Sequence, residues 1–330
     1  MCTKGLSSSR GLSLTAAALA AAACVTFAAA HAQASLIVYE PYNYGLAQGT
    51  TMTGVTTNAL GLTGAYTDTN IDNSSSVNDV TYNTASMSFG NLQTQGGSIT
   101  SNPNGGKPIF SVGLNSSDVN AFASGNVYGS FVLSTNANNL GTGGAGSSYV
   151  DGLLFGTSTS DDNSSIINIS PISWGQNYGQ IRVGTGTGAI AAAGTGTQLA
   201  INTPYLELFQ ISLGNSTNSA SSWTLSASQF AHFQGNLTAA NLDAAGTGTA
   251  SNQITEEAFA SGPASTNVAN EIGGITNMSL FSFGSTGTYD EIRISNASLA
   301  ETAPVSEPAT LGLVALGGLG LLLLKRRKAV

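Results

Sequence analysis

Cysteine is almost absent from this sequence. Its two cysteines, Cys2 and Cys24, both lie within the first 34 residues. Residues 35–304 contain none, so disulfides and thiolate metal sites are excluded from this segment. The segment is nevertheless long enough to bury a hydrophobic core without such cross-links.

Positive charge is also scarce. Residues 35–304 hold three cations, Lys107, Arg182 and Arg293, against sixteen acidic residues, a net charge of −13. Phosphate binding depends on clustered lysine and arginine, so nucleic acid is excluded as a partner. The acids are scattered along the chain, which favours a solvated acidic surface. Binding of divalent cations is the alternative.

Residues for catalysis are few. His232 is the only histidine of the segment, which removes Ser-His-Asp triads and histidine metal clusters, and we interpret it as a packed polar residue. A glycosidase needs two carboxylates that face each other. The adjacent pairs at 161–162, 256–257 and 290–291 would point to opposite faces of a strand. The sequence therefore indicates no catalytic residue, and we expect no enzyme.

Apolar residues at helical spacing are rare between the two ends of the chain. They come instead in short alternating runs bounded by glycine, asparagine, serine or proline, which is typical of strands. The main runs are residues 36–39, 127–133, 166–169, 205–213, 223–225 and 278–283. Helices of one or two turns are expected only at 226–233 and 237–244. Strands must therefore cover one another, which predicts an all-β fold, an antiparallel β-sandwich.

The segment reads as one domain. No internal repeat of useful period divides it. The glycine-rich stretches 141–146 and 184–197 are typical of loops between strands rather than of linkers. We therefore predict a single β-sandwich domain over residues 35–304.

The N-terminus has the layout of a secretory signal peptide. Lys4 and Arg10 precede an alanine-rich apolar stretch, residues 11–30, and small residues follow it. Ala32 and Ala34 fit the positions before a cut by signal peptidase, which would make Ser35 the first mature residue. A cut two residues earlier is the alternative. We expect residues 1–34 to be removed on export.

The C-terminus reads as a short membrane anchor. Residues 309–324 are apolar or small, and as a helix they span about 24 Å, slightly less than a ~30 Å hydrocarbon core. The basic end, residues 325–330, should remain cytoplasmic, which leaves the preceding chain outside the inner membrane. Hydropathy alone does not distinguish a permanent tail anchor from a transient one.

The same end resembles a PEP-CTERM sorting signal. Ser306, Glu307 and Pro308 occupy the Pro-Glu-Pro-like element within residues 305–310, and an apolar helix and an arginine-rich end follow in the usual order. Serine replaces the first proline. The resemblance implies processing by an exosortase in a Gram-negative bacterium. It also implies a transient anchor, a final place at the cell surface or outside the cell, and association with exopolysaccharide.

The two ends of the central segment resemble concanavalin A-like jelly rolls of the laminin-G and lectin type. Residues 36–44 match the first strand of these domains, and residues 282–295, with their Asp-Glu-Ile-Arg-Ile stretch, match the closing strand. The resemblance implies that the closing strand returns beside the first. Alternation places Ile292 and Ile294 toward the core, while Glu291 and Arg293 face outward and pair.

One segment has the oxygens of a calcium loop. Asp68, Asn70 and Asp72 stand at alternate positions, and Asp79 lies further along the chain. Their side-chain oxygens could converge on one calcium ion, which takes six to eight oxygen ligands. An ordinary polar turn is the alternative. No other cofactor is indicated.

A carbohydrate-binding module is the alternative to a non-enzymatic matrix protein. Lectin-like sandwiches bind sugars by stacking aromatic side chains and fixing hydroxyl groups. The candidate aromatics are Trp174, Tyr178, Trp223, Tyr39, Tyr42 and Tyr44, each of which packing in the core would also explain.

Overall fold

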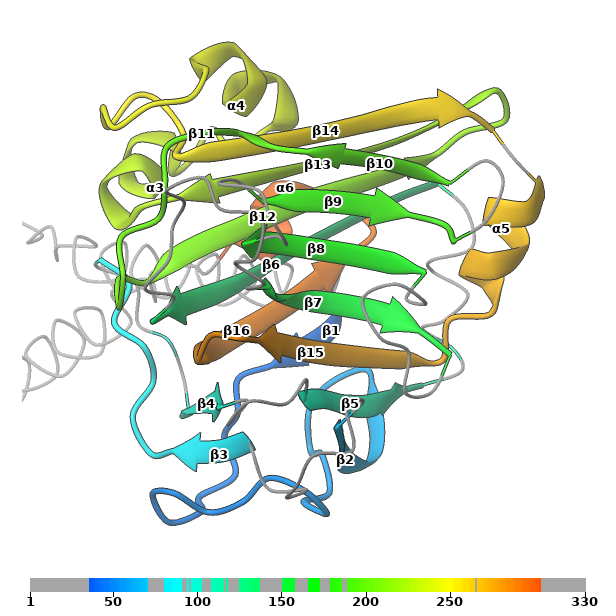
Figure 1. Ribbon diagram of the computed structural model, residues 1–330. Helices are drawn as coiled ribbons and strands as arrows, with labels where there is room; N and C mark the ends of the chain where they lie inside the picture. The colour runs from blue at the N-terminus through cyan, green and yellow to red at the C-terminus, as the bar shows by residue number, and fades with distance from the viewer. Residues whose placement is uncertain are drawn as a thin grey trace, which may run out of the picture. The chain divides into compact units, whose positions relative to one another are not determined.

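Two antiparallel sheets lie face to face (Figure 1). The computed structural model describes residues 36–70, 80–90, 94, 96–102, 108–115, 117, 125–136, 150–157, 166–172, 179–185, 189–264 and 266–303. These residues belong to one compact unit, Leu36–Pro304.

The larger sheet has nine strands. Its order is β11 (Thr195–Gly196), β14 (Glu256–Pro263), β13 (Thr217–Leu225), β12 (Tyr205–Leu213), β6 (Gly125–Thr135), β16 (Gly287–Ser295), β4 (Ser98–Ser101) and β3 (Val80–Asn83). The ninth strand, β1 (Leu36–Glu40), pairs with the second half of β16, while β4 pairs with the first half. The expected return of the closing strand beside the first is therefore confirmed.

The smaller sheet has seven strands. Its order is β10 (Ile190–Ala193), β9 (Gln180–Val183), β8 (Ile167–Ile172), β7 (Val150–Gly156), β15 (Asn277–Phe283), β5 (Pro108–Leu114) and β2 (Leu62–Asn70). The all-β sandwich is confirmed. The loop expected at 184–197 is wrong in part, because β10 and β11 lie within it. Ile190 inserts into the core there, and both short strands find edges to pair with.

The core between the sheets is built from alternate residues of both. The Phe155 ring of β7 lies 6.4 Å from the Phe209 ring of β12, centroid to centroid, across the two layers. Gly129 of β6 pairs with Phe209 in register, and a Cβ at Gly129 would fall 2.0 Å from that ring. Glycine is therefore required where the phenyl ring lies across the neighbouring strand.

Replacing Gly129 with alanine should destabilise the domain by about 1–3 kcal/mol, because the added methyl group overpacks the core against Phe209. Gly273→Ala is the matched control. A Cβ there meets no atom within 4 Å, so that variant should melt at or slightly above the wild-type temperature. Thermal melts of the two variants compare them directly. Equal midpoints would contradict this account of the core.

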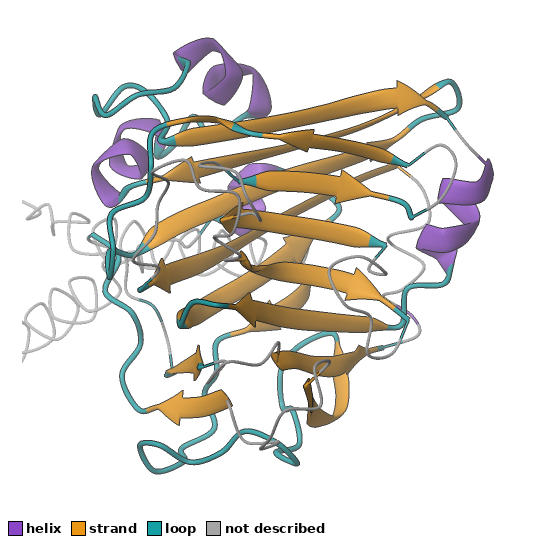
Figure 2. Ribbon diagram, viewed as in Figure 1, coloured by secondary structure: helices purple, strands orange, loops and turns teal. Residues whose placement is uncertain are grey.

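Short helices lie at two sides of the strands and behind them (Figure 2). The two expected helices are confirmed as α3 (Ala227–Phe233) and α4 (Ala239–Ala245). A capping box starts α3, in which Ser226 and Gln229 exchange side-chain and backbone hydrogen bonds. Alternation along the strands gave no sign of two further helices, α5 (Thr266–Gly273) and α6 (Leu299–Thr302).

A second hydrophobic core lies on the outer face of the nine-stranded sheet. Trp223 of β13 and Leu208 of β12 project from that face. Phe230 of α3, Leu242 of α4 and Leu299 of α6 pack over them. Trp223 is fully buried, which contributes on the order of 2–3 kcal/mol. The three helices thus cover the part of the outer face that carries Trp223 and Leu208.

Among the described residues no helix is long and apolar enough to cross a membrane. The expected signal peptide, residues 1–34, and the expected anchor, residues 309–324, both lie outside the described part of the chain.

Candidate functional site

Several predicted site residues lie outside the described residues. They are Ala32, Ala34, Asp72, Asp79, Ser306, Glu307 and Pro308. Asp68 is described, and it lies within β2 opposite Phe110 rather than in a turn, with 8% of its surface exposed. Asn70 ends the same strand. In the part of the chain that the structure describes, no group of three or more His, Cys, Asp or Glu residues is placed to hold a metal. The calcium site stays a prediction.

The predicted sugar-stacking aromatics are mostly inside the protein. Trp223 is buried, and its indole N–H donates to Asp243 Oδ1 at 2.9 Å. Tyr42 is also fully buried, while Tyr39 and Tyr44 are half-buried. Trp174 and Tyr178 lie outside the described residues. Trp223 and Tyr42 are therefore wrong as binding residues, because packing takes both of them.

His232 differs from its prediction in the opposite way. It is exposed on α3 and meets the edge of the Phe233 ring, with centroids 5.1 Å apart. Helical spacing places Phe230 and Phe233 against the sheet and turns His232 to solvent.

The expected solvated acidic surface is wrong for a large group of acids. Buried carboxylates are Glu40, Asp68, Asp151, Glu207, Glu256, Asp290 and Glu291. Asp68 and Asp151 lie in β2 and β7 of the smaller sheet, and the other five lie in the nine-stranded sheet. Alternation alone does not predict burial of those five, because both faces of the nine-stranded sheet are covered over part of their area.

A bulge in β16 brings two acids onto one face of the sheet. The pairing of β16 with β6 shifts between Asp290 and Arg293, and Glu291 has a positive φ of 53°. Asp290 accepts hydrogen bonds from the Ser86 hydroxyl and the Met87 N–H, both at 2.7 Å. Glu291 bonds Arg293, also on the outer side. Asp290 and Glu291 therefore do not point to opposite faces as expected, because the extra residue breaks the alternation.

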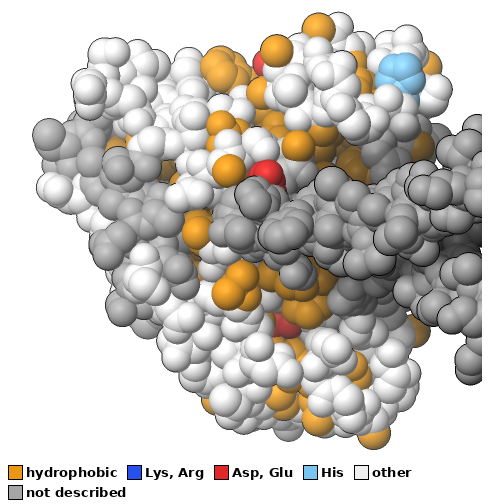
Figure 3. Space-filling view, turned by 180° about the vertical axis from the view of Figure 1, so that it is seen from behind, with side chains coloured by type: hydrophobic (Ala, Val, Ile, Leu, Met, Phe, Trp, Pro, Cys, Tyr) orange, Lys and Arg blue, Asp and Glu red, His pale blue; other side chains and the backbone are white. Residues whose placement is uncertain are grey.

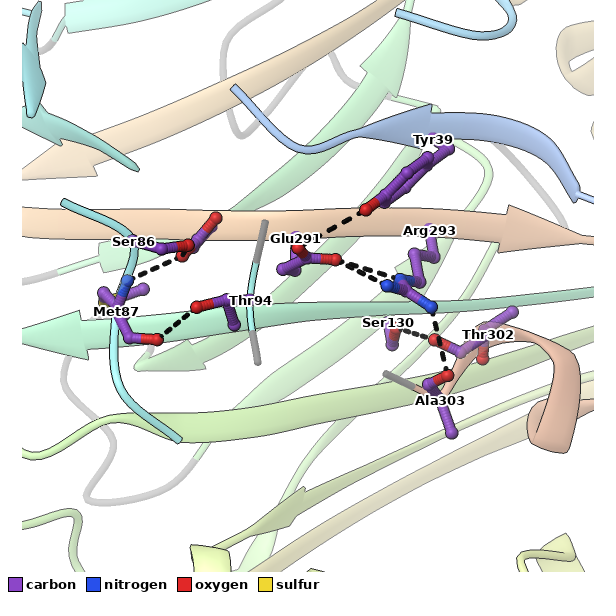
Figure 4. A network of polar contacts seen from close by, with 10 residues as sticks. Tyr39, Ser86, Met87, Thr94, Ser130, Glu291, Arg293, Thr302 and Ala303 are labelled. Atoms are coloured by element: carbon purple, nitrogen blue, oxygen red, sulfur yellow. Dashed lines mark hydrogen bonds and ion pairs between the residues drawn. The ribbon is translucent and has the colours of Figure 1, made fainter. Parts of the chain in front are cut away.

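Arg293 ties the last residues of the domain to β16 (Figure 4). The expected ion pair is confirmed, with the Arg293 Nη2 2.7 Å from Glu291 Oε2 and Nε at 3.1 Å. The guanidinium also donates to the Ala303 carbonyl at 3.3 Å and lies 4.7 Å from the centre of the Tyr39 ring. The expectation that these polar residues face solvent is wrong, because α6 and β1 cover them.

Burial changes the proton affinity of these groups. It raises the pKa of Asp290 to about 8, against the lowering effect of its bonds to Ser86 and Met87. It raises the pKa of Tyr39 to about 12, and the Glu291 charge adds to the rise. The β16 network is therefore buried and holds α6 and Ala303 against the sheet. It does not reach a substrate in solvent.

Another pair of carboxylates faces the core between the sheets. Glu207 of β12, Thr224 of β13 and Glu256 of β14 lie in register across three neighbouring strands. Thr224 donates to Glu207 Oε2 at 2.6 Å, and the Gly179 N–H donates to Glu256 Oε2 at 3.1 Å. Burial raises the pKa of Glu207 to about 8 and that of Glu256 to about 9. These acids hold protons near neutral pH and are closed off by the smaller sheet.

Glu40 anchors a polar cluster beside β1. It accepts from the Tyr42 N–H and the Tyr44 hydroxyl, both at 2.6 Å, and from the Tyr66 hydroxyl. Burial raises its pKa, against the lowering effect of these bonds. Tyr44 and Tyr66 therefore serve packing here, and they are not presented to a ligand.

Another part of the outer face of the nine-stranded sheet lies away from the second hydrophobic core and is not covered by a described helix. Two cross-strand rows define this outer patch: Phe259, Ser221, Gln210 and Tyr128, then Ser261, Ser219, Ser212 and Asn126. All eight side chains are exposed or half-buried. The residues come from four strands that are distant in sequence, so no spacing in the chain could reveal them together.

The C-terminal residues of the chain match a known sorting motif. Residues 304–328 match the model of the PEP-CTERM protein-sorting motif. The chain carries a PEP-CTERM motif. Such a motif implies export and sorting by an exosortase. No curated protein sequence matches the chain.

Solved structures give distant matches to the fold. The binding domain of botulinum neurotoxin serotype C1 matches with a TM-score of 0.41 and 8% identity over 81% of this chain and 50% of its own. The binding domain of botulinum neurotoxin DC in complex with rat synaptotagmin II matches with a TM-score of 0.38 and 8% identity. The match covers 77% of this chain and 49% of that domain. The T. cruzi calreticulin globular domain matches with a TM-score of 0.35 and 10% identity. The match covers 79% of this chain and 98% of the calreticulin domain. The chain thus spans about half the length of the two toxin domains.

Proposed function

We propose that this chain is a non-enzymatic protein of the cell surface or extracellular matrix, sorted by an exosortase and associated with exopolysaccharide. The match of residues 304–328 to the PEP-CTERM motif carries the proposal. Signal peptidase cuts after Ala34, the apolar span 309–324 holds the chain in the inner membrane, and exosortase then removes the tail near Glu307 and Pro308. The mature domain is thereby delivered outside the cell.

Deleting the exosortase gene should leave the protein in the inner membrane, because the uncut span 309–324 still anchors it. Fractionation of wild-type and deletion cells, followed by blotting against the domain, measures this. The variant Glu307→Ala/Pro308→Ala in wild-type cells should reproduce the deletion. The same fractions in wild type, deletion strain and variant would show a plain tail anchor and overturn the sorting route.

The alternative proposal is a carbohydrate-binding module on a concanavalin A-like jelly roll. The pairing of β1 with β16 and the uncovered outer patch support it. A glycoside hydrolase is less favoured, because Glu207 and Glu256, which lie on one face of the sheet with Thr224 between them, are 1% and 3% exposed and lie under the smaller sheet. A catalytic acid and base must meet the sugar between them.

A further inference from the structure

Phe259 is exposed in the middle of a strand. Its two neighbours, Ala258 and Ala260, face the core, while 56% of the Phe259 surface is open to solvent. Leaving a phenyl ring in water forgoes about 1.5–3 kcal/mol of burial, so an occupant that covers it would gain apolar contact.

A second aromatic residue lies in the same cross-strand row. Phe259 pairs with Ser221, Ser221 with Gln210, and Gln210 with Tyr128. Strands lie about 4.8 Å apart, so the two aromatic positions are separated by about 14 Å. Tyr128 is half-buried against the second core, and its hydroxyl accepts a hydrogen bond from Asn126 Nδ2 at 3.1 Å. The row therefore has the half-buried Tyr128 ring at one end and the exposed Phe259 ring at the other.

Between the rings the outer patch offers neutral hydrogen-bonding groups. Ser221 and Gln210 lie in the first row, and Ser219 and Ser212 in the second. The Gln210 side-chain amide donates to Ser212 Oγ at 3.0 Å, which fixes the orientation of the amide. Its carbonyl oxygen can then accept a hydrogen bond from a ligand. Hydroxyl and amide groups at strand spacing match a ligand with many hydroxyls.

Charge narrows the class of ligand. None of the eight residues of the outer patch is charged, and no lysine or arginine colour is visible among the described residues on this side of the protein (Figure 3). Glu257 borders the patch, opposite Trp223 on β13. Asp243 interacts with Glu257 at this border, so an anionic polymer would meet two acids there. A neutral polymer would meet no such repulsion.

We propose that the outer patch binds an uncharged polysaccharide, whose sugar rings stack on Phe259 and Tyr128 while their hydroxyls bond the serine and amide groups between. A pyranose ring has an apolar C–H face and a polar rim, so it fits a flat surface that alternates aromatic and hydroxyl groups. The inference rests on the proposed function, since an exported domain meets polysaccharide outside the cell.

Binding of the full chain, purified in mild detergent, to neutral glucans tests the proposal. Affinity gels that contain dextran, amylose or laminarin, and pull-down on cellulose, serve as probes, with anionic alginate as the comparison. We expect retardation by at least one neutral glucan. Phe259→Ala should weaken that binding about tenfold, as loss of one stacked ring implies, and Phe259→Trp should keep it.

Ile201→Ala is the matched control, because Ile201 is also an exposed apolar residue, 42% open, but lies outside the outer patch. It should bind like wild type. Wild-type affinity in Phe259→Ala would overturn the outer patch as the site, while leaving exosortase sorting to its own test. Binding of alginate alone, or of none of the probes, would also overturn it.

Discussion

Replacing Glu256 with glutamine should make the protein more stable at pH 8 than the wild type, and about equal to it at pH 5. The amide keeps the shape of the protonated acid and can still accept the hydrogen bond from the Gly179 N–H. Glutamine cannot ionise, so folding of the variant does not require the proton that the buried Glu256 takes up at this pH.

The direction follows from the raised pKa. Burial, with a smaller contribution from Glu207, puts the pKa of folded Glu256 at about 9, whereas an unfolded glutamate titrates near 4.3. The stabilisation is complete below the unfolded pKa and is lost as pH rises through the folded one. In that window one such group lowers the free energy of unfolding by about 1.4 kcal/mol per pH unit. Glu207 and Asp290, each with a pKa raised by burial to about 8, act in the same sense.

Melting temperatures from pH 5 to pH 9 measure the effect. The wild-type midpoint should fall across this range, and Glu256→Gln should fall less steeply. Glu271→Gln is the control, because Glu271 accepts from Thr185 near the surface and should leave the slope unchanged. Parallel curves for wild type and Glu256→Gln would show that the carboxylate is not held neutral in the core.

Removing the Arg293 side chain should cost about 3–5 kcal/mol of folding stability. Glu291 is fully buried, and its partner supplies two hydrogen bonds, at 2.7 and 3.1 Å. Arg293→Ala removes the cationic partner of this buried carboxylate, which keeps the longer hydrogen bond from the Tyr39 hydroxyl at 3.4 Å. Loss of one partner of a buried ion pair is among the more destabilising single changes. It also frees the Ala303 carbonyl and removes the cation over the Tyr39 ring.

The double variant Glu291→Gln/Arg293→Met separates charge from packing. It removes both charges and nearly keeps the volume, so it should recover much of the loss seen in Arg293→Ala. Arg293→Lys should fall between wild type and alanine, because an ammonium lacks the planar fork that bonds the carboxylate twice. Chemical denaturation measures all three. Equal stability of Arg293→Ala and wild type would contradict the role assigned to this pair.

Alternating apolar runs predicted the long strands β6, β12 and β15 and the end of β13, but they gave no sign of β2, β5, β7 or β14. They did not predict that the outer face would also be buried. Leu206, Leu208 and Trp223 interleave with inward residues, and only the folded chain brings α3 and α4 onto them. Acids such as Glu207 thus lie inside a sheet that is covered on both faces.

Two features of the site depend on geometry that leaves no pattern in the sequence. The bulge at Glu291 places a glutamate at positive φ, where glycine or asparagine would be the usual indication. The outer patch joins residues 128, 210, 221 and 259 through strand register, which spacing along one strand cannot reveal. The sorting signal, by contrast, is contiguous, and the sequence alone predicted it at the position of the matched motif.

The intact mass of the surface-exposed protein tests sorting most directly. In wild-type cells the mass should correspond to a chain that starts at Ser35 and lacks the segment after the Glu307 and Pro308 region, and no peptide from residues 311–330 should be found in that fraction. In an exosortase deletion the same peptides should be present in the inner membrane. Surface protein of identical mass in both strains, with the basic C-terminal end intact, would contradict the account.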